Sequence, residues 1–285
     1  MRKQVSQVGR RDFLRALGAT IATAAILPTN VDSAGHGESS LQVWSCGGLS
    51  EAFWPANARF TEKSGTRIAY TGAFAAALGK SLLGDAHTEV FAGRVLKLAK
   101  DLRASGKMIY FRPLCFTEYV MVTPKGNPAR IASLQDLARS DVRVHLPLGA
   151  SPPGGDAVVA ILKKAKLDKE VLPRLAQRES CVIRMMPEIV SGEAHVSIVE
   201  RRLTRLAKFE GRVDVIDIPA EFFPPGPRTF TIGVMKHAKN RALADAYVEF
   251  MTSEEGQAFL ERQGFIPARS ERGRELIDTL GVKDA

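Results

Sequence analysis

The fold is decided by the stretch LQVWSCGGLSEAF, residues 41–53. Leu41 to Trp44 has the apolar character of a β-strand, and Cys46-Gly47-Gly48 predicts a turn. Ser50 follows, and serine is a residue type that caps helices. We therefore expect a strand that turns directly into a helix running towards Glu62, which is the basic unit of an α/β fold.

The same alternation of short strands and amphipathic helices continues along the chain. It predicts strands at 67–70, 90–91, 119–123, 142–146, 196–199 and 229–235, and helices at 73–83, 95–104, 181 onward and 242–263. Pro/Gly breaks at 124–128 and 224–227 enclose a middle block. We expect an α/β protein of two lobes, each a mainly parallel sheet flanked by helices. Lobe 1 would comprise residues 40–123 with 228–285, and lobe 2 residues 124–227.

Composition excludes several classes of protein. The chain has 285 residues, of which 45% are hydrophobic and 25% charged, with only three cysteines. These values exclude a disordered chain and a small disulfide scaffold. No apolar run approaches the roughly 18 to 20 residues that span a bilayer, so we expect no membrane insertion. The net charge of +9 is compatible with an anionic partner.

The first 35 residues are typical of an export signal. A basic stretch, Gly9 to Arg15, precedes an apolar run from Ala16 to Leu27, and small residues surround Ala34. The paired arginines before Asp-Phe-Leu resemble a twin-arginine signal, so we expect export to the periplasm in folded form. Without residues 1–35 the chain loses five basic and two acidic residues, which leaves a net charge of +6. We therefore expect no nucleic-acid partner.

Four segments, in order along the chain, resemble one protein family: 41–53, 122–128, 191–199 and 253–268. Together they are similar to the molybdate-binding type of periplasmic solute-binding protein over about residues 41–270. The resemblance implies a type II binding protein whose two lobes close on a small inorganic ligand. It also implies a binding protein rather than an enzyme. We expect this protein to be a monomer. Its membrane partner would be an ABC permease, for import, or a histidine kinase, for sensing.

The resemblance places the ligand at loops that enter helices. Helix N-termini carry unpaired N–H groups and partial positive charge, and α/β sheets bind ligands at the carboxyl ends of their strands. The loops concerned are 45–48, 71–74, 149–155, 180–182 and 199–201. From these loops we expect ligand contacts by Gly47, Gly48, Thr71, Gly72, Ala150 and Glu200.

The chain departs from the family pattern in its cysteines. Cys46 stands where the family has small or hydroxyl residues, and Glu200 stands at a position that is often Tyr. Matching to the family places Cys46, Cys115 and Cys181 around one cleft. Three outcomes are open: a disulfide with one spare thiol, three separately buried thiols, or a site of three thiol ligands.

Three sulfur ligands would suit a thiophilic species better than zinc, which takes four ligands. Our hypothesis is arsenite, or a soft metal ion such as Cu(I), bound by Cys46, Cys115 and Cys181 without a further cofactor. The alternative is molybdate or tungstate bound by N–H and hydroxyl donors. An alternative of another class is an envelope thiol enzyme or chaperone, which would need an exposed thiol beside a base.

A run of basic residues follows Glu200. The residues Arg201, Arg202 and Arg205, with Lys208, either raise the positive potential of the cleft or form a solvated helix face. No catalytic Ser/His/Asp order or dinucleotide fingerprint occurs in its required context, which makes an enzyme the weakest class.

Overall fold

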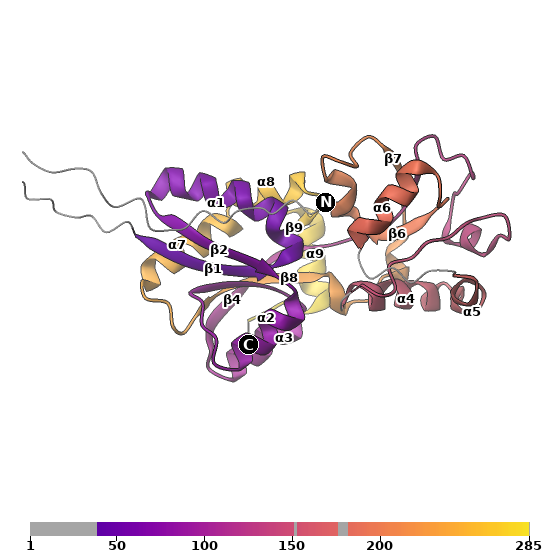
Figure 1. Ribbon diagram of the computed structural model, residues 1–285. Helices are drawn as coiled ribbons and strands as arrows, with labels where there is room; N and C mark the ends of the chain where they lie inside the picture. Colours follow the sequence, from indigo (N-terminus) through magenta and orange to yellow (C-terminus); the bar gives the residue numbers. More distant parts are fainter. Residues whose placement is uncertain (1–38, 151–152, 176–181, 285) are drawn as a thin grey trace, which may run out of the picture. The chain divides into compact units, whose positions relative to one another are not determined.

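The computed structural model describes residues 39–150, 153–175 and 182–284. The expected export segment and Cys181 lie outside these residues. In the described chain, strands and helices assemble around two β-sheets, one of six strands and one of three (Figure 1).

The six-stranded sheet has the order β2-β1-β3-β8-β4-β9. Its strands are β1 (Ser40–Cys46), β2 (Arg67–Ala73), β3 (Val90–Arg94), β4 (Met108–Phe116), β8 (Thr229–Met235) and β9 (Ile266–Pro267). Only β1 pairs in parallel, with β2 on one side and β3 on the other. The pairs β3–β8, β4–β8 and β4–β9 are antiparallel.

The three-stranded sheet is antiparallel throughout. It has the order β6-β5-β7, with β5 (Tyr119–Pro124) paired to β6 (Ser197–Glu200) and β7 (Val213–Asp217). The expectation of mainly parallel sheets is therefore wrong, although the α/β class holds. The reason lies in β8, which enters lobe 1 from the far end of the chain and runs between β3 and β4 in the opposite direction.

Helices cover both faces of the larger sheet (Figure 1). Leu41 and Val43 of β1 pack in one core with Phe53 and Tyr247, which come from α1 and α7. On the other face Phe91 packs with residues of α2 and α3. The helices of this half are α1 (Ser50–Ser64), α2 (Ala75–Leu83), α3 (Leu96–Ala104), α7 (Arg241–Thr252), α8 (Glu254–Arg262) and α9 (Glu271–Leu280).

The smaller sheet has its own helices and cores. They are α4 (Gly154–Lys164), α5 (Asp168–Val171) and α6 (Val182–Ser191), with short 3-10 turns between them. One core joins β5 to α4, and a second joins β5 to Met185 and Met186. Among the described strands β5 pairs with β6 and β7, whereas the expected lobe boundary at 123/124 would assign it to lobe 1. We propose from sheet membership that lobe 1 comprises residues 40–116 with 229–285, and lobe 2 residues 119–227.

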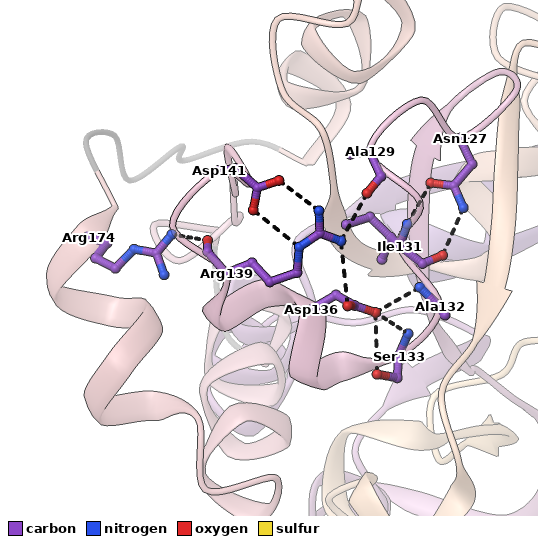
Figure 2. Close-up of polar contacts among 9 residues, drawn as sticks. All are labelled: Asn127, Ala129, Ile131, Ala132, Ser133, Asp136, Arg139, Asp141 and Arg174. Atoms are coloured by element: carbon purple, nitrogen blue, oxygen red, sulfur yellow. Dashed lines mark hydrogen bonds and ion pairs between the residues drawn. The ribbon is translucent and has the colours of Figure 1, made fainter.

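The strand expected at 142–146 is reduced to bridge pairing: an isolated parallel bridge joins Val144 to Val196, and the N–H of His145 donates to the carbonyl of Val196. A polar network precedes this segment. Figure 2 shows Asp136 accepting hydrogen bonds from the N–H groups of Ala132 and Ser133, while Arg139 pairs with Asp141. Arg174 donates to the carbonyl of Arg139 at 2.6 Å.

The helix expected at 242–263 is two helices. Ser253 ends α7, and its hydroxyl accepts from the N–H of Gly256 to cap α8. Gly256 permits the tight corner, because a Cβ there would lie 2.1 Å from the carbonyl oxygen of Phe250. The apolar periodicity continues through the corner, and so the sequence pattern concealed it.

We predict that Gly256→Ala lowers the free energy of unfolding by about 1 to 3 kcal/mol, because the added methyl group collides with backbone that cannot yield. Gly226→Ala is the matched control, since nothing lies within 4 Å of a Cβ at Gly226. Urea unfolding of both variants measures the difference. Equal stability of the two variants would contradict this account of the corner.

Candidate functional site

The first loop forms a short 3-10 turn, Gly47–Leu49, between β1 and α1. A Cβ at Gly48 would lie 3.4 Å from Nε of Arg202, so the guanidinium of Arg202 rests against the bare backbone of this loop. The expectation of a turn at Cys46-Gly47-Gly48 is thus confirmed, and its partner is a cation from the basic run after Glu200.

Ser50 does not cap α1. Its hydroxyl accepts a hydrogen bond from the Tyr70 hydroxyl at 3.1 Å, and Ser45 lies 2.6 Å from the same phenol oxygen. A Cβ at Gly72 would lie only 2.4 Å from Oγ of Ser50. Gly72 therefore makes room for this hydroxyl cluster, while the neighbouring Thr71 is exposed.

A buried charged cluster joins the ends of two strands from different sheets. Arg94, the last residue of β3, donates from Nη1 to Oε1 of Glu200 at 2.5 Å and from Nη2 to the hydroxyl of Tyr119 at 3.0 Å. Arg202 donates from Nε to Oε2 of the same carboxylate at 2.6 Å. Arg94 and Glu200 are 6% and 5% exposed. We call Arg94, Glu200 and Arg202 the charged cluster.

The electrostatics of the charged cluster favour full ionisation. Burial opposes the charge of Glu200, but the two guanidinium groups outweigh it and lower the pKa of this carboxyl to about 2. Burial likewise opposes the charges of Arg94 and Arg202, and the carboxylate raises the pKa of both above the usual value. Burial also raises the pKa of Tyr119. The charged cluster thus carries two positive charges and one negative.

Donors for a ligand remain at Arg202. Among the described residues, its Nε is paired with Glu200, and no hydrogen-bond partner is found for its two Nη groups. A guanidinium edge of this kind matches carboxylate and phosphate-like groups in a fork geometry. The net positive charge and this edge together make the cluster suited to an anion.

The thiols in the described chain do not have the character of thiolate ligands. Cys46 is 7% exposed and Cys115 fully buried, and neither forms a disulfide. Burial raises the pKa of Cys46, although the N–H of Gly48 and the nearby arginines partly oppose this, and it raises the pKa of Cys115 well above the usual value. The described residues contain no group of three His, Cys, Asp or Glu that could hold a metal ion. Cys181, the third expected ligand, lies outside them.

Ala150 lies in the loop before α4. Its N–H donates to the carbonyl of Pro147 at 3.1 Å, which commits that donor to a local turn. A Cβ at Gly155 would lie 2.5 Å from the carbonyl of Leu148, so this loop too is packed against itself.

One family model matches most of the chain. The family described as bacterial extracellular solute-binding protein matches residues 41–266. This chain belongs to that family.

Solved structures share the fold of this solute-binding protein. The "substrate binding domain of putative molybdenum ABC transporter from Clostridium difficile" has a TM-score of 0.70 and 18% identity, and the alignment covers 81% of this chain and 99% of that one. The periplasmic molybdate-binding protein of Azotobacter vinelandii has a TM-score of 0.63 and 15% identity, with 79% and 98% covered. The expected two-lobed α/β architecture of type II binding proteins is confirmed by these neighbours.

One curated relative matches over a shorter region. The "Putative ABC transporter substrate-binding lipoprotein YvgL" of Bacillus subtilis (strain 168) is 24% identical over 148 residues, which cover 52% of this chain. The match spans 55% of the length of that relative. Within the described part of the solute-binding protein, no helix is long and apolar enough to cross a membrane.

Local sequence patterns indicate Glu200 and the glycine loop, but they do not indicate Arg94. The expected strand at 90–91 is longer, and Arg94 ends a segment, Val90–Arg94, that is buried throughout. A charged residue at the end of a fully apolar strand is the signal that could have identified it. The basic run is divided: Arg202 joins the charged cluster, while Arg201 pairs with Glu118 and Asp217.

We predict a pH dependence that isolates Glu200. Its pKa is about 2 in the folded solute-binding protein and near the usual 4.5 when unfolded, so the ion pairs stabilise the fold above about pH 5. That stability, about 3 kcal/mol, is lost as the pH falls from 5 through 2. Urea unfolding between pH 6 and pH 3 should show a shallower decline for Glu200→Gln than for the unsubstituted protein.

The control for this measurement is Glu249→Gln. Glu249 pairs with Arg112 in an exposed position, where ion pairs contribute little. Its pH profile should match that of the unsubstituted protein. Parallel profiles for all three proteins would show that the Glu200 carboxyl is not held ionised by the two arginines.

Proposed function

We propose that the protein captures a small anionic solute outside the cytoplasmic membrane and delivers it to an ABC permease. The observation that carries this proposal is the buried charged cluster, Arg94, Glu200 and Arg202, at the ends of β3 and β6. Two guanidinium groups held in a dry environment with one carboxylate leave an excess positive charge. Such a charge attracts an anion more strongly than it would in water.

The position of the charged cluster supports the same function. Arg94 ends a strand at the carboxyl edge of the larger sheet, where α/β proteins bind ligands. Glu200 and Arg202 come from the smaller sheet and the turn after it. An anion bound here would contact both lobes, as expected for a binding protein that closes on its solute. Molybdate and tungstate are the inorganic candidates, since relatives are titled as molybdenum or molybdate binders.

Export and partners complete the proposal. The paired arginines at 10–11 and the apolar run after them support twin-arginine export to the periplasm. The name of the curated relative supports an ABC permease as partner. We propose a monomer that binds and releases its solute without transforming it, and import rather than signalling to a histidine kinase.

The test is anion binding to variants of Arg202. Arg202→Lys keeps the positive charge but loses the two-pronged donor edge, so we predict affinity for the bound anion to fall by about tenfold or more. Isothermal titration with molybdate, tungstate and simple carboxylates measures the effect. Arg205→Lys is the matched control, because Arg205 is exposed and the same substitution there leaves the charged cluster untouched. Equal losses in both variants would show that the effect does not come from the donor edge of Arg202.

A thiophilic solute is the second candidate. The charges of Arg94 and Glu200 act on the pKa of the Cys46 thiol, and Cys46 in turn acts on the pKa of Cys115. Arsenite could condense with three thiols, since As(OH)3 and three R–SH give As(SR)3 and three waters. The buried, protonated state of Cys115 argues against it, because ligand thiols must lose their protons. An exposed thiol beside a base, which a thiol enzyme would need, is not found among the described residues.

Cys46→Ser separates the two candidates. We predict that anion affinity changes by less than about threefold and that arsenite fails to raise the melting temperature of the reduced protein, since a solute that binds only the native state stabilises it. Differential scanning fluorimetry with arsenite, Cu(I), molybdate and tungstate provides the measurement. Stabilisation by arsenite that disappears in Cys46→Ser would establish the thiol site instead.

A further inference from the structure

A pocket beside the charged cluster indicates more about the solute. It has a volume of about 480 Å³ and lies between α2, the end of β3, the first turn of α3 and the residue before α4. This volume is within the roughly 300–1,000 Å³ typical of pockets that bury organic ligands. A tetrahedral oxyanion, one central atom with its oxygens, would leave most of it empty.

The lining of this pocket is mainly apolar. The side chains and backbone that form it belong to Ala75, Ala76, Gly79, Lys80, Leu83, Arg94, Val95, Leu98 and Pro153. Leu83 is 42% exposed, and Phe74, which precedes α2, is 72% exposed. Large apolar side chains left open beside a pocket are typical of surfaces that bind an apolar group.

The backbone at the pocket is strained where it meets the charged cluster. Val95 has a φ of 75°, a left-handed conformation that is unfavourable for its β-branched side chain. This conformation joins Arg94 at the end of β3 to the first turn of α3, and both residues line the pocket. Strained backbone is common at functional sites, and here the strained residue is Val95, which directly follows Arg94.

The charge at the pocket is small. Arg94 donates its two Nη groups to Glu200 and to the hydroxyl of Tyr119. Lys80 is the other cation that lines the pocket, and it forms no ion pair within the described residues. One lysine beside an apolar wall matches an anion with a single charge and an apolar body better than a compact dianion.

Resting on the proposed function, we propose that the solute is an organic monocarboxylate. Its carboxylate faces Lys80, and its apolar body lies along α2 and α3 against Ala76, Leu83 and Leu98. Removal of the apolar body from water supplies affinity that a molybdate ion could not obtain from these residues.

A bulky side chain placed in the pocket tests this proposal and leaves the charged cluster unchanged. In Ala76→Trp the indole occupies the pocket, whereas in Ala77→Trp the same side chain is added at an exposed neighbour that does not line it. We predict by isothermal titration that benzoate and octanoate bind the unsubstituted protein, bind Ala76→Trp about tenfold more weakly or not at all, and bind Ala77→Trp with unchanged affinity. Far-UV circular dichroism and urea unfolding confirm that both variants fold.

Lys80→Gln tests the head of the solute, with Lys100→Gln as control because Lys100 is exposed on α3 and outside the pocket. We expect a loss of about threefold to tenfold for benzoate in the first and none in the second. Equal binding of the carboxylates to both Trp variants would overturn the assignment of the pocket.

Titration with molybdate separates the monocarboxylate proposal from the proposed anion-binding function. Tight molybdate binding that depends on Arg202, with no binding of either carboxylate, would overturn the monocarboxylate and leave the anion-binding function standing. Binding of no anion of either kind would overturn both.

Discussion

The ion pair between Arg94 and Glu200 is the constraint around which the site is organised. Both side chains are buried, and water has been removed from a guanidinium and a carboxylate at once, which is favourable only if every charge finds a close partner. Arg202 and Tyr119 meet that requirement, one at the second carboxylate oxygen and one at Arg94. Removing either charge of such a pair would cost about 3 to 5 kcal/mol, because the other would be left buried and alone.

Two glycines of the first loops lie against side chains. A Cβ at Gly48 would be at ordinary contact distance from the guanidinium of Arg202, and Gly72 leaves space for the hydroxyl of Ser50. Glycine-rich turns at helix starts are often interpreted as cradles for anions. Here side chains approach the two glycines instead.

The two chain crossings between the sheets support one another. Thr117, between β4 and β5, donates its N–H to the carbonyl of Arg228 at 2.9 Å, just before β8 begins. Burial lowers the pKa of Arg228, whose Nη2 is buried without a hydrogen-bond partner in the described chain, as is the Thr117 hydroxyl. Nε of Arg228 also donates to the carbonyl of Thr117 at 3.4 Å, so two hydrogen bonds join the crossings.

The sequence by itself determined the local elements and their order: the strand, turn and helix of residues 41–64, the Pro/Gly breaks, and Glu200 as an unusual residue at a strand end. β4 is not evident from the sequence, because Arg112 and Pro113 interrupt its apolar run. α7 and α8 resemble one helix in the sequence, because the apolar periodicity continues through the corner between them. Tertiary contacts settle that the larger sheet is mixed, that Cys115 lies in a core, and that Arg94 and Arg202 share one carboxylate. Strand direction, burial of a thiol and pairing of charges depend on contacts between residues that lie far apart in the chain, such as Val90 with Val234 and Arg94 with Glu200, and a local pattern does not encode them.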